Sequence, residues 1–156
     1  MTLTFARRRR LAARRLGGER GTALLEMALT LPLLLLVAVG IFEFGRAFQT
    51  WEVLTNAARE GARLAVLPSS TPADTEARAR AYLTSGSLNG ASATVTVTAT
   101  MIPIGLGTAS ASLVKIDYPF QFIVLQPVAS LIVHGTAVGS PIVMSASAEM
   151  RNESPF

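Results

Sequence analysis

An apolar segment of 21 residues, 22–42, constrains the structure of this chain more than any other feature. Seven arginines precede the segment, and its one charged residue is Glu26. A helix of this length covers roughly 30 Å at about 1.5 Å per residue, which matches the hydrocarbon core of a bilayer. A carboxylate inside such a span costs roughly 2.5–3.5 kcal/mol on insertion scales, so Glu26 is a candidate functional residue that needs a partner.

Charge is unevenly distributed along the 156 residues. The formal net charge is +4, but residues 1–21 contain seven arginines and one glutamate, whereas the rest contain seven basic and nine acidic residues. Arginines flank the cytoplasmic end of membrane spans, so we expect a cytoplasmic N-terminus and an extracytoplasmic domain at residues 43–156. Nucleic-acid binding is not expected, because the arginine run has no interleaved aromatic residues and no recognisable binding fold follows it.

Two other interpretations of the N-terminus fit parts of the pattern. A cleaved secretory signal also has a basic region, an apolar region and a small-residue cleavage site, for which Ala38-Val39-Gly40 would serve. This interpretation is disfavoured because the apolar stretch is longer than in most such signals and contains an acid. An uncleaved membrane anchor is not limited to the length of a secretory signal, and it is the main alternative interpretation of the N-terminus.

The helix is predicted to continue beyond the span, to about residue 66. From Phe44 onward, apolar residues recur at steps of four and three, which traces one face of a helix. Leu67-Pro68 ends the helix, because the residue before a proline disfavours the helical conformation. Residues 22–66 would form a helix of roughly 65 Å, and Pro32 is expected to kink it. The residues on the predicted apolar face are Phe44, Phe48, Trp51, Leu54, Ala58, Ala62 and Ala65.

A second, shorter helix is expected from residue 72 to about residue 84. Thr71 can cap its N-terminus, Pro72 suits the first helical position, and Asp74 interacts favourably with the helix dipole in the first turn. The residues expected on its modest apolar face are Ala77, Ala81 and Tyr82, and those expected in solvent are Arg78 and Arg80.

Beyond residue 90 the apolar period changes from that of a helix to that of a strand. Apolar and polar residues alternate over 94–101, 114–120 and 144–151, which predicts three strands that each bury one face. Residues 102–107 would join the first two strands, and residues 121–140 are expected to include a short helix because they are too long for a bare loop. The sequence therefore predicts an α+β fold, in which a long N-terminal transmembrane-plus-exterior helix packs on a small antiparallel β-sheet, with a second short helix.

Catalysis finds little support in the sequence. The chain has no cysteine and a single histidine, His134, so neither a thiolate nucleophile nor a histidine and cysteine metal site is expected. Glu43 and Arg46 form an i,i+3 pair at the end of the span, for which a structural role is expected. We predict that the protein is not an enzyme and requires no cofactor or metal.

The order of basic leader, glycine, short polar start and acid-containing apolar helix resembles the class III signal of type IV pilins and pseudopilins. In that family, a membrane-bound prepilin peptidase cuts after the glycine. The resemblance implies that Gly21 is the last leader residue, that Thr22 is the new N-terminus, and that Glu26 is the acid at mature position five. In pilins this acid pairs with the free amine of a neighbouring subunit during assembly, which replaces two costly lone charges in lipid by one pair.

A second motif resembles the signature of TadE-like proteins, the pilin-like components of the tight-adherence (Flp) pilus machinery. The motif consists of residues 40–46, GIFEFGR, and residues 56–63, NAAREGAR. Met27 follows the acid where the major Flp pilins have tyrosine, and the chain is far longer than those pilins, so an accessory subunit is favoured over a major one. The signature residues that the resemblance singles out are Glu43, Gly45, Arg46, Asn56, Arg59, Glu60, Gly61 and Arg63.

These resemblances imply a minor pilin or pseudopilin-type component in the assembly of Flp pili. The expected organisation is a leader at residues 1–21, a transmembrane segment at 22–42 and an extracytoplasmic pilin-like domain at 43–156. The implied partners are the prepilin peptidase, other pilin-like subunits, the assembly platform and membrane lipid, with the protein in the cytoplasmic membrane or in a surface pilus. The alternative is an uncleaved single-span envelope protein that presents a small binding or structural domain.

Overall fold

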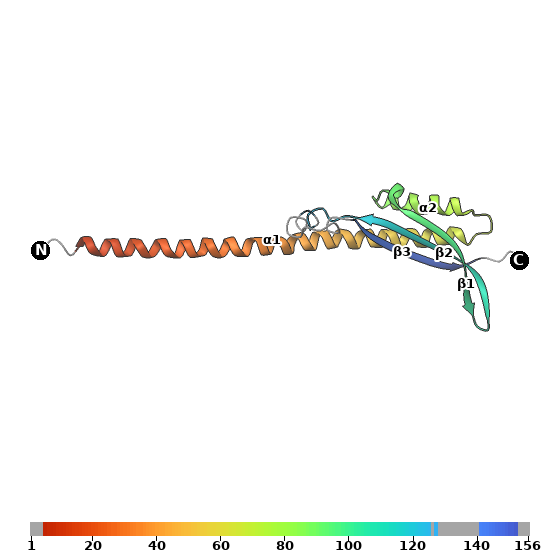
Figure 1. The fold of residues 1–156 in the computed structure, drawn as a ribbon, viewed down its shortest axis with the longest axis horizontal. Coiled ribbons are helices and arrows are strands. Elements are labelled where there is room, and N and C mark those ends of the chain that lie inside the picture. The colour runs from red at the N-terminus through yellow and green to blue at the C-terminus, as the bar shows by residue number, and fades with distance from the viewer. Residues whose placement is uncertain (1–4, 126, 128–140, 153–156) are drawn as a thin grey trace. The chain divides into compact units, whose positions relative to one another are not determined.

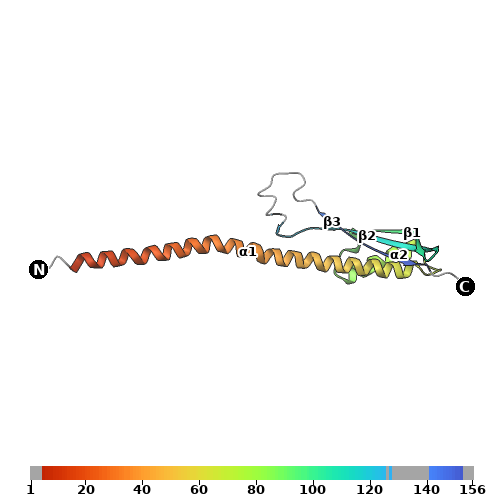
Figure 2. The same cartoon turned by 90° about the horizontal axis from the view of Figure 1, so that it is seen from below.

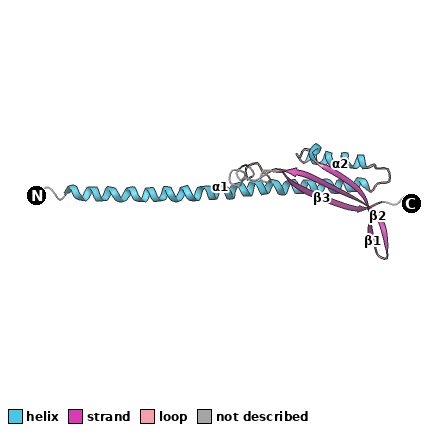
Figure 3. Cartoon of the chain, viewed as in Figure 1, coloured by secondary structure: helices cyan, strands magenta, loops and turns pink. Residues whose placement is uncertain are grey.

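A computed structural model of the chain describes the backbone of residues 5–125, 127 and 141–152, and the side chains of these ranges from residue 21 onward. The elements form two compact units, residues 1–42 and residues 43–156, called here the N-terminal and C-terminal units. Helices and strands are both present, so the predicted α+β class is confirmed (Figures 1 and 3). In chain order the elements are α1 (Phe5–Ala65), α2 (Pro72–Ser85), the short helix η1 (Gly90–Ser92), β1 (Thr94–Ile104), β2 (Gly107–Phe120) and β3 (Ile142–Arg151).

Helix α1 begins earlier than predicted, at Phe5 instead of residue 22, because the leader is rich in alanine, leucine and arginine, which all favour helix. It continues through Pro32 and ends at Ala65, as the Leu67-Pro68 pair predicted. In the N-terminal unit, the side chains of residues 21–38 are all exposed. The part of α1 from Gly21 onward is long and apolar enough to cross a membrane, which agrees with single-pass anchoring.

The buried face of α1 in the C-terminal unit differs from the predicted one. Leu54, Ala58 and Ala62 are buried as expected, but the aromatic residues of the predicted face are exposed. The face is rotated because α1 packs through small side chains, which allow the sheet and α2 to approach its backbone. The buried residues of this part of α1 are Glu43, Thr50, Leu54, Ala57, Ala58, Gly61 and Ala62, and the exposed aromatic residues are Phe44, Phe48 and Trp51.

The three strands form one antiparallel sheet, as predicted (Figure 2). The order of the strands in the sheet is β1-β2-β3. β1 and β2 are longer than expected, because residues 102–107 belong mostly to the strands and only Gly105-Leu106 form the turn between them. Pro103 is tolerated because β1 is an edge strand. Gly105 has φ +58°, a conformation that tight hairpin turns require and that glycine adopts without strain.

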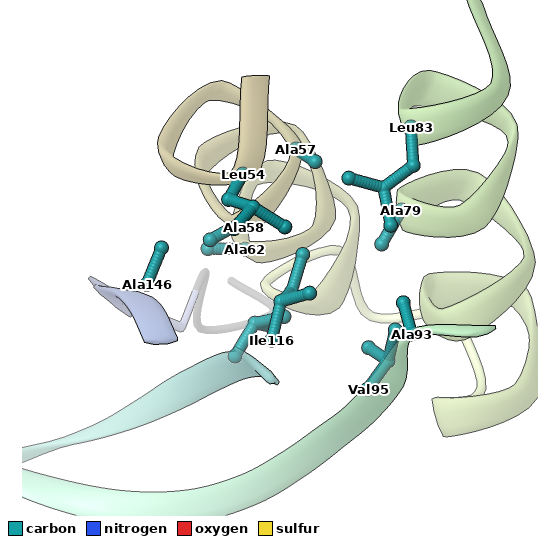
Figure 4. Packing of buried hydrophobic residues seen from close by; sticks show 11 residues of the cluster. Leu54, Ala57, Ala58, Ala62, Ala79, Leu83, Ala93, Val95, Ile116 and Ala146 are labelled. Carbon is teal, nitrogen blue, oxygen red and sulfur yellow. The ribbon is translucent and has the colours of Figure 1, made fainter. Parts of the chain in front are cut away.

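The core lies where α1, α2 and the sheet meet. Side chains from both helices and all three strands converge there, and Leu54, Leu83 and Ile116 are fully buried (Figure 4). Strand residues Val95, Ile116 and Ala146 lie on one face of the sheet, and the register places Val95 opposite Ile116 and Ile116 opposite Ala146. The predicted packing of a helix on a small antiparallel sheet is therefore confirmed.

Helix α2 has the predicted N-terminus but a different buried face. Thr71 and Asp74 form a reciprocal capping box, with Pro72 in the first turn. The predicted apolar face was wrong, because the residues that pack inward have a spacing of four and include the larger Leu83. The buried residues are Thr75, Ala79 and Leu83, whereas Ala77 and Ala81 are exposed and Tyr82 is half-buried.

The segment between β2 and β3 includes helical residues at Leu125 and Pro127. The short helix predicted within residues 121–140 falls largely on residues 126 and 128–140, and His134 is among them. These positions lie outside the described residues, so that helix stays a prediction.

Candidate functional site

The predicted processing and assembly residues lie where the described side chains of α1 begin. Gly21, Thr22 and Glu26 are all helical and exposed. A Cβ atom built at Gly21 would meet no other group within 4 Å, so packing does not require a glycine there. Among the described residues, the Glu26 carboxylate has no hydrogen bond or ion pair, and the Glu26 backbone oxygen accepts a hydrogen bond from the Thr30 hydroxyl at 2.5 Å.

Glu43, the first acid beyond the predicted span, is in contrast fully buried within the C-terminal unit. One carboxylate oxygen accepts a hydrogen bond from the backbone N–H of Val124 at 2.6 Å, across 81 residues of sequence. The other carboxylate oxygen accepts a hydrogen bond from the Arg46 guanidinium at 2.9 Å. Glu43 therefore fastens the segment after β2 to helix α1, which goes beyond the i,i+3 pair that the sequence predicted.

The surroundings of Glu43 determine its ionisation. Burial alone would raise the pKa of the carboxyl, because desolvation penalises the charged form. Hydrogen bonds from the backbone N–H groups of Val124 and Ile123, together with the charge and hydrogen bond of Arg46, outweigh that effect and hold the pKa below its usual value. Glu43 is therefore a carboxylate whose charge the fold itself satisfies.

Aromatic rings surround the Arg46 guanidinium and extend this connection between α1 and the end of β2. The guanidinium lies 5.3 Å from the centroid of the Phe120 ring, a cation–π distance. Phe120 and Phe122 meet edge to face with centroids 5.2 Å apart, and Phe44 meets Phe122 at 6.0 Å. Sequence reasoning did not pair these aromatic residues with Arg46, although the signal was available in the Tyr118-Pro119-Phe120 run at the end of a predicted strand.

Among the described residues of the C-terminal unit, two hollows border Arg46. The smaller, of about 200 Å³, lies between α1 and the turn after α2, where it is lined by Gln49, Val53 and Ser87 among others. The larger, of about 530 Å³, lies along the end of β2, where Tyr118 and Phe120 line it. Both are open at the surface and mix polar with apolar groups, and the charge of Arg46 between them is balanced by Glu43.

The polar residues of the second signature motif hold α2 against α1 or lie in solvent. Glu60 accepts hydrogen bonds from two nitrogens of Arg78, at 2.6 and 3.1 Å, which joins the two helices. Arg63 lies 3.9 Å from the other oxygen of Glu60, and exposed Arg59 reaches the Asn56 side-chain oxygen at 3.4 Å. Arg78 is exposed, as expected, and its pairing with Glu60 across the helix contact was not predicted.

The ion pair with α2 also determines the ionisation of Glu60. The hydrogen bond from Arg78 lowers the pKa of the carboxyl most, and the charges of Arg78 and Arg63 add to it against the opposing effect of burial. Arg80, which was also expected in solvent, is half-buried and donates to the backbone oxygen of Gly90 at 3.3 Å. Its side chain also lies 3.8 Å from Glu76.

The two signature glycines differ in their surroundings. Gly61 is buried, and a Cβ atom there would lie 3.2 Å from Val114 of β2, 3.5 Å from Ala79 and 3.7 Å from Thr75 of α2. Gly45 is exposed, and a Cβ atom there would meet nothing within 4 Å. The close approach of α2 and the sheet therefore leaves little room for a side chain at residue 61.

The described residues offer no catalytic constellation. Within the described ranges, no three histidine, cysteine, aspartate or glutamate residues are grouped so that they could hold a metal ion. Four of the signature residues, Glu43, Arg46, Glu60 and Gly61, fasten β2 and α2 to α1. Gly21, Thr22 and Glu26 belong to the N-terminal unit, where their side chains are exposed on helix α1.

Comparison with known families identifies the matching part of the chain. Residues 21–63 match the family of TadE-like proteins, which confirms the resemblance found in the sequence. The match contains the predicted processing residues, Glu26 and the whole helix signature. No curated protein and no solved structure was found to match. TadE-like proteins are a structural family associated with pili, not an enzyme family, so the match indicates involvement in the Tad/Flp pilus system.

Proposed function

We propose that this protein is a minor pilin or pseudopilin-type component in the assembly of Flp pili, processed by a prepilin peptidase between Gly21 and Thr22. The observation that carries the proposal is the extent of the family match, which begins at Gly21 and leaves out the arginine-rich leader. Packing gives no reason for a glycine at residue 21, whereas recognition by a peptidase would. The length and apolar surface of α1 suit a substrate that is presented to the peptidase from the membrane.

Glu26 is the residue proposed to act in assembly. Its side chain is exposed on an apolar helix, and among the described residues it has no partner within its own chain. Cleavage after Gly21 would create a free amine at Thr22, and the amine of a neighbouring subunit supplies the cation that Glu26 needs. Pairing two such charges avoids the cost of leaving either alone in lipid.

The proposed location is the cytoplasmic membrane, with the leader in the cytoplasm and residues 43–156 outside it. The argument is the excess of arginine before the span, combined with the acidic balance after it. The partners proposed are the peptidase, other pilin-like subunits and the assembly platform. A reporter that is active only outside the cytoplasm should work when fused after Phe156, and activity of a cytoplasmic reporter there would contradict the orientation.

N-terminal sequencing and intact mass of the membrane-extracted protein test the processing step. In cells that contain the peptidase, the sequence should start Thr-Ala-Leu-Leu-Glu. Gly21→Ala should leave the leader attached if the peptidase requires glycine, whereas Gly45→Ala, at an equally open glycine of the same helix, should be processed normally. A start at Met1 would favour the uncleaved anchor, and a start at Ile41 would favour a secretory signal.

The assembly role is tested separately with Glu26→Gln. This change should leave unfolding of the C-terminal unit within about 0.5 kcal/mol, the usual range for a substitution outside a core. Association should weaken strongly, because losing one member of a poorly solvated ion pair costs about 3–5 kcal/mol. Crosslinking to other pilus components in membranes is the measurement, and Glu52→Gln, at an exposed acid of the same helix, is the control. Unchanged crosslinking and piliation would remove the assembly role.

A further inference from the structure

Apolar side chains are exposed together at one end of the C-terminal unit, where β2 ends and β3 begins. Ile123 follows β2 and is 59% exposed, and Val143, near the start of β3, is 64% exposed. Pro119 of β2 pairs with Val143, and Phe120 pairs with Ile142, so the two segments lie at the same end of the sheet (Figure 1). The exposed group is called here the apolar rim, and it consists of Phe44, Ile123, Val124, Ile142 and Val143.

Contacts within the C-terminal unit connect the apolar rim to the first residues of α1 in that unit. The backbone N–H of Val124 donates a hydrogen bond to the Glu43 carboxylate at 2.6 Å, and the rings of Phe44 and Phe122 lie 6.0 Å apart. Glu43 directly follows residue 42, the last residue of the proposed membrane span. The covalent link between residues 42 and 43 therefore keeps this end of the unit near the point where the chain leaves the hydrocarbon, at any angle between the two units.

The chemistry of the apolar rim suits lipid. Residues 118–148 contain no Asp, Glu, Lys or Arg, so charge cannot select a partner for the segment after β2. The headgroup region extends about 5–8 Å beyond each side of the hydrocarbon core, and the rim begins at the second residue after the proposed span. Apolar side chains that enter this layer bind in proportion to the apolar area that they remove from water. Lipid is therefore an apolar partner that the proposed location already places beside the rim.

Glu43 removes a polar obstacle to such a contact. The backbone of Ile123 and Val124 is neither helix nor strand, and irregular backbone is costly near hydrocarbon unless its N–H groups find partners. The Glu43 carboxylate accepts hydrogen bonds from both of these N–H groups, and the Arg46 guanidinium, at 2.9 Å, balances its charge. The two N–H groups are thus satisfied inside the chain, while the apolar side chains of the same residues stay exposed.

We propose that the apolar rim binds the lipid surface of the membrane, as a second membrane contact beside the span of α1. The inference rests on the proposed location, in which residues 22–42 cross the membrane, and it concerns the protein while it is in that membrane. Glu43 holds the segment after β2 against α1, and the side chains of the rim enter the headgroup layer. This contact holds one end of the C-terminal unit at the lipid surface.

Single-tryptophan variants of the full chain test the lipid contact, because Trp51 is the only tryptophan and can be replaced by phenylalanine. In the Trp51→Phe background, Ile123→Trp places the probe on the apolar rim. Leu106→Trp places it on the exposed turn between β1 and β2, at the opposite end of β2, and is the control. Both variants are reconstituted in phosphatidylcholine vesicles with and without brominated acyl chains. Brominated lipid should quench Ile123→Trp several-fold more than Leu106→Trp.

A second position on the apolar rim guards against a local effect of the first substitution. Val143→Trp, in the same background, places the probe on β3 and should also be quenched by brominated lipid and protected from acrylamide in water. Strong quenching by acrylamide and weak quenching by brominated lipid at both positions would show that water covers the rim. Protection from both quenchers would show that protein covers it. Either result would overturn the proposal.

The failure of this inference is distinguishable from failure of the proposed function, because intact mass gives the N-terminus of the same samples. If the chain starts at Thr22 and the apolar rim is not quenched by brominated lipid, the lipid contact is wrong while the proposed processing stands. If the leader remains attached and the rim is quenched, the processing is wrong while the lipid contact stands, since an uncleaved anchor has the same span. A chain that starts at Ile41 lacks the span, and both proposals are then wrong.

Discussion

Gly61 and Gly45 lie on the same helix in different surroundings, so replacing each with alanine should have opposite effects on stability. Alanine favours a helix over glycine by about 0.5–1 kcal/mol, and Gly45→Ala should gain this amount because its Cβ would meet nothing within 4 Å. At Gly61 the same Cβ would lie 3.2 Å from a methyl group of Val114, which is itself fully buried and has a stiff side chain. Forcing a methyl into such a packed site costs about 1–3 kcal/mol.

The difference between the two variants isolates the packing cost, because the helix propensity is common to both. We expect Gly61→Ala to be less stable than Gly45→Ala by about 1–3 kcal/mol in the free energy of unfolding. Urea unfolding of the full chain in detergent micelles, followed by Trp51 fluorescence, measures this difference. If Gly61→Ala were as stable as Gly45→Ala, α2 and the sheet would not approach α1 as closely as the structure shows.

A double-mutant cycle identifies the neighbour that resists the added methyl. Val114→Ala removes the methyl groups that lie nearest the new Cβ, so Gly61→Ala should cost less in that background than alone. Residues in contact show interaction energies of about 0.5–3 kcal/mol, and here the sign should be favourable. If the stability changes of Gly61→Ala and Val114→Ala simply add in the double mutant, the added methyl is opposed by Ala79 or Thr75 of α2 and not by the sheet.

Three further predictions concern the C-terminal unit and use the same unfolding assay. Leu83→Ala should cost about 2–5 kcal/mol because the side chain is fully buried, whereas Leu106→Ala, at the exposed hairpin turn, should stay within about 0.5 kcal/mol. Thr71→Ala should cost about 0.5–2 kcal/mol by removing the N-cap of α2, and an unchanged midpoint would contradict the capping role. Because Arg78 lowers the folded-state pKa of Glu60, the stability from that pair is present above the ordinary glutamate pKa and is lost as pH falls through the lowered value. The wild type should therefore lose more stability than Glu60→Gln between neutral and acidic pH, and equal losses would contradict this.

The sequence predicted the elements well because their signals are local. The end of α1 before Pro68, the Thr71 cap of α2 and the alternation of the three strands each depend on neighbouring residues, and each is found as expected. The alternation also implied that one face of the sheet packs on a helix, which the burial of Val95 and Ile116 bears out. The processing residues were recognised from a short motif, and their role stays a prediction.

The sequence failed where distant segments decide which side of a helix is buried. Phe44, Phe48 and Trp51 are large and apolar, so periodicity placed them in the core, yet they are exposed and α1 packs through Leu54 and the alanines that follow it. The contact between Glu43 and Val124 spans 81 residues, and nothing near Glu43 in the sequence indicates it. The Glu60 and Arg78 pair likewise depends on how α2 folds back along α1.

The two acids Glu26 and Glu43 show how the same side chain can serve folding or assembly. Glu43 is buried, but two backbone N–H groups and the Arg46 guanidinium surround its carboxylate, so its charge is satisfied within the chain. The Glu26 carboxylate has no hydrogen bond or ion pair among the described residues, although its neighbours along the helix are apolar. If residues 22–42 cross the membrane as proposed, the cost of that charge must be met by another molecule or by protonation. A free amine at Thr22 exists only after the leader is removed. If this amine is the partner of Glu26, as proposed, the subunits can form the ion pair only after they have been processed.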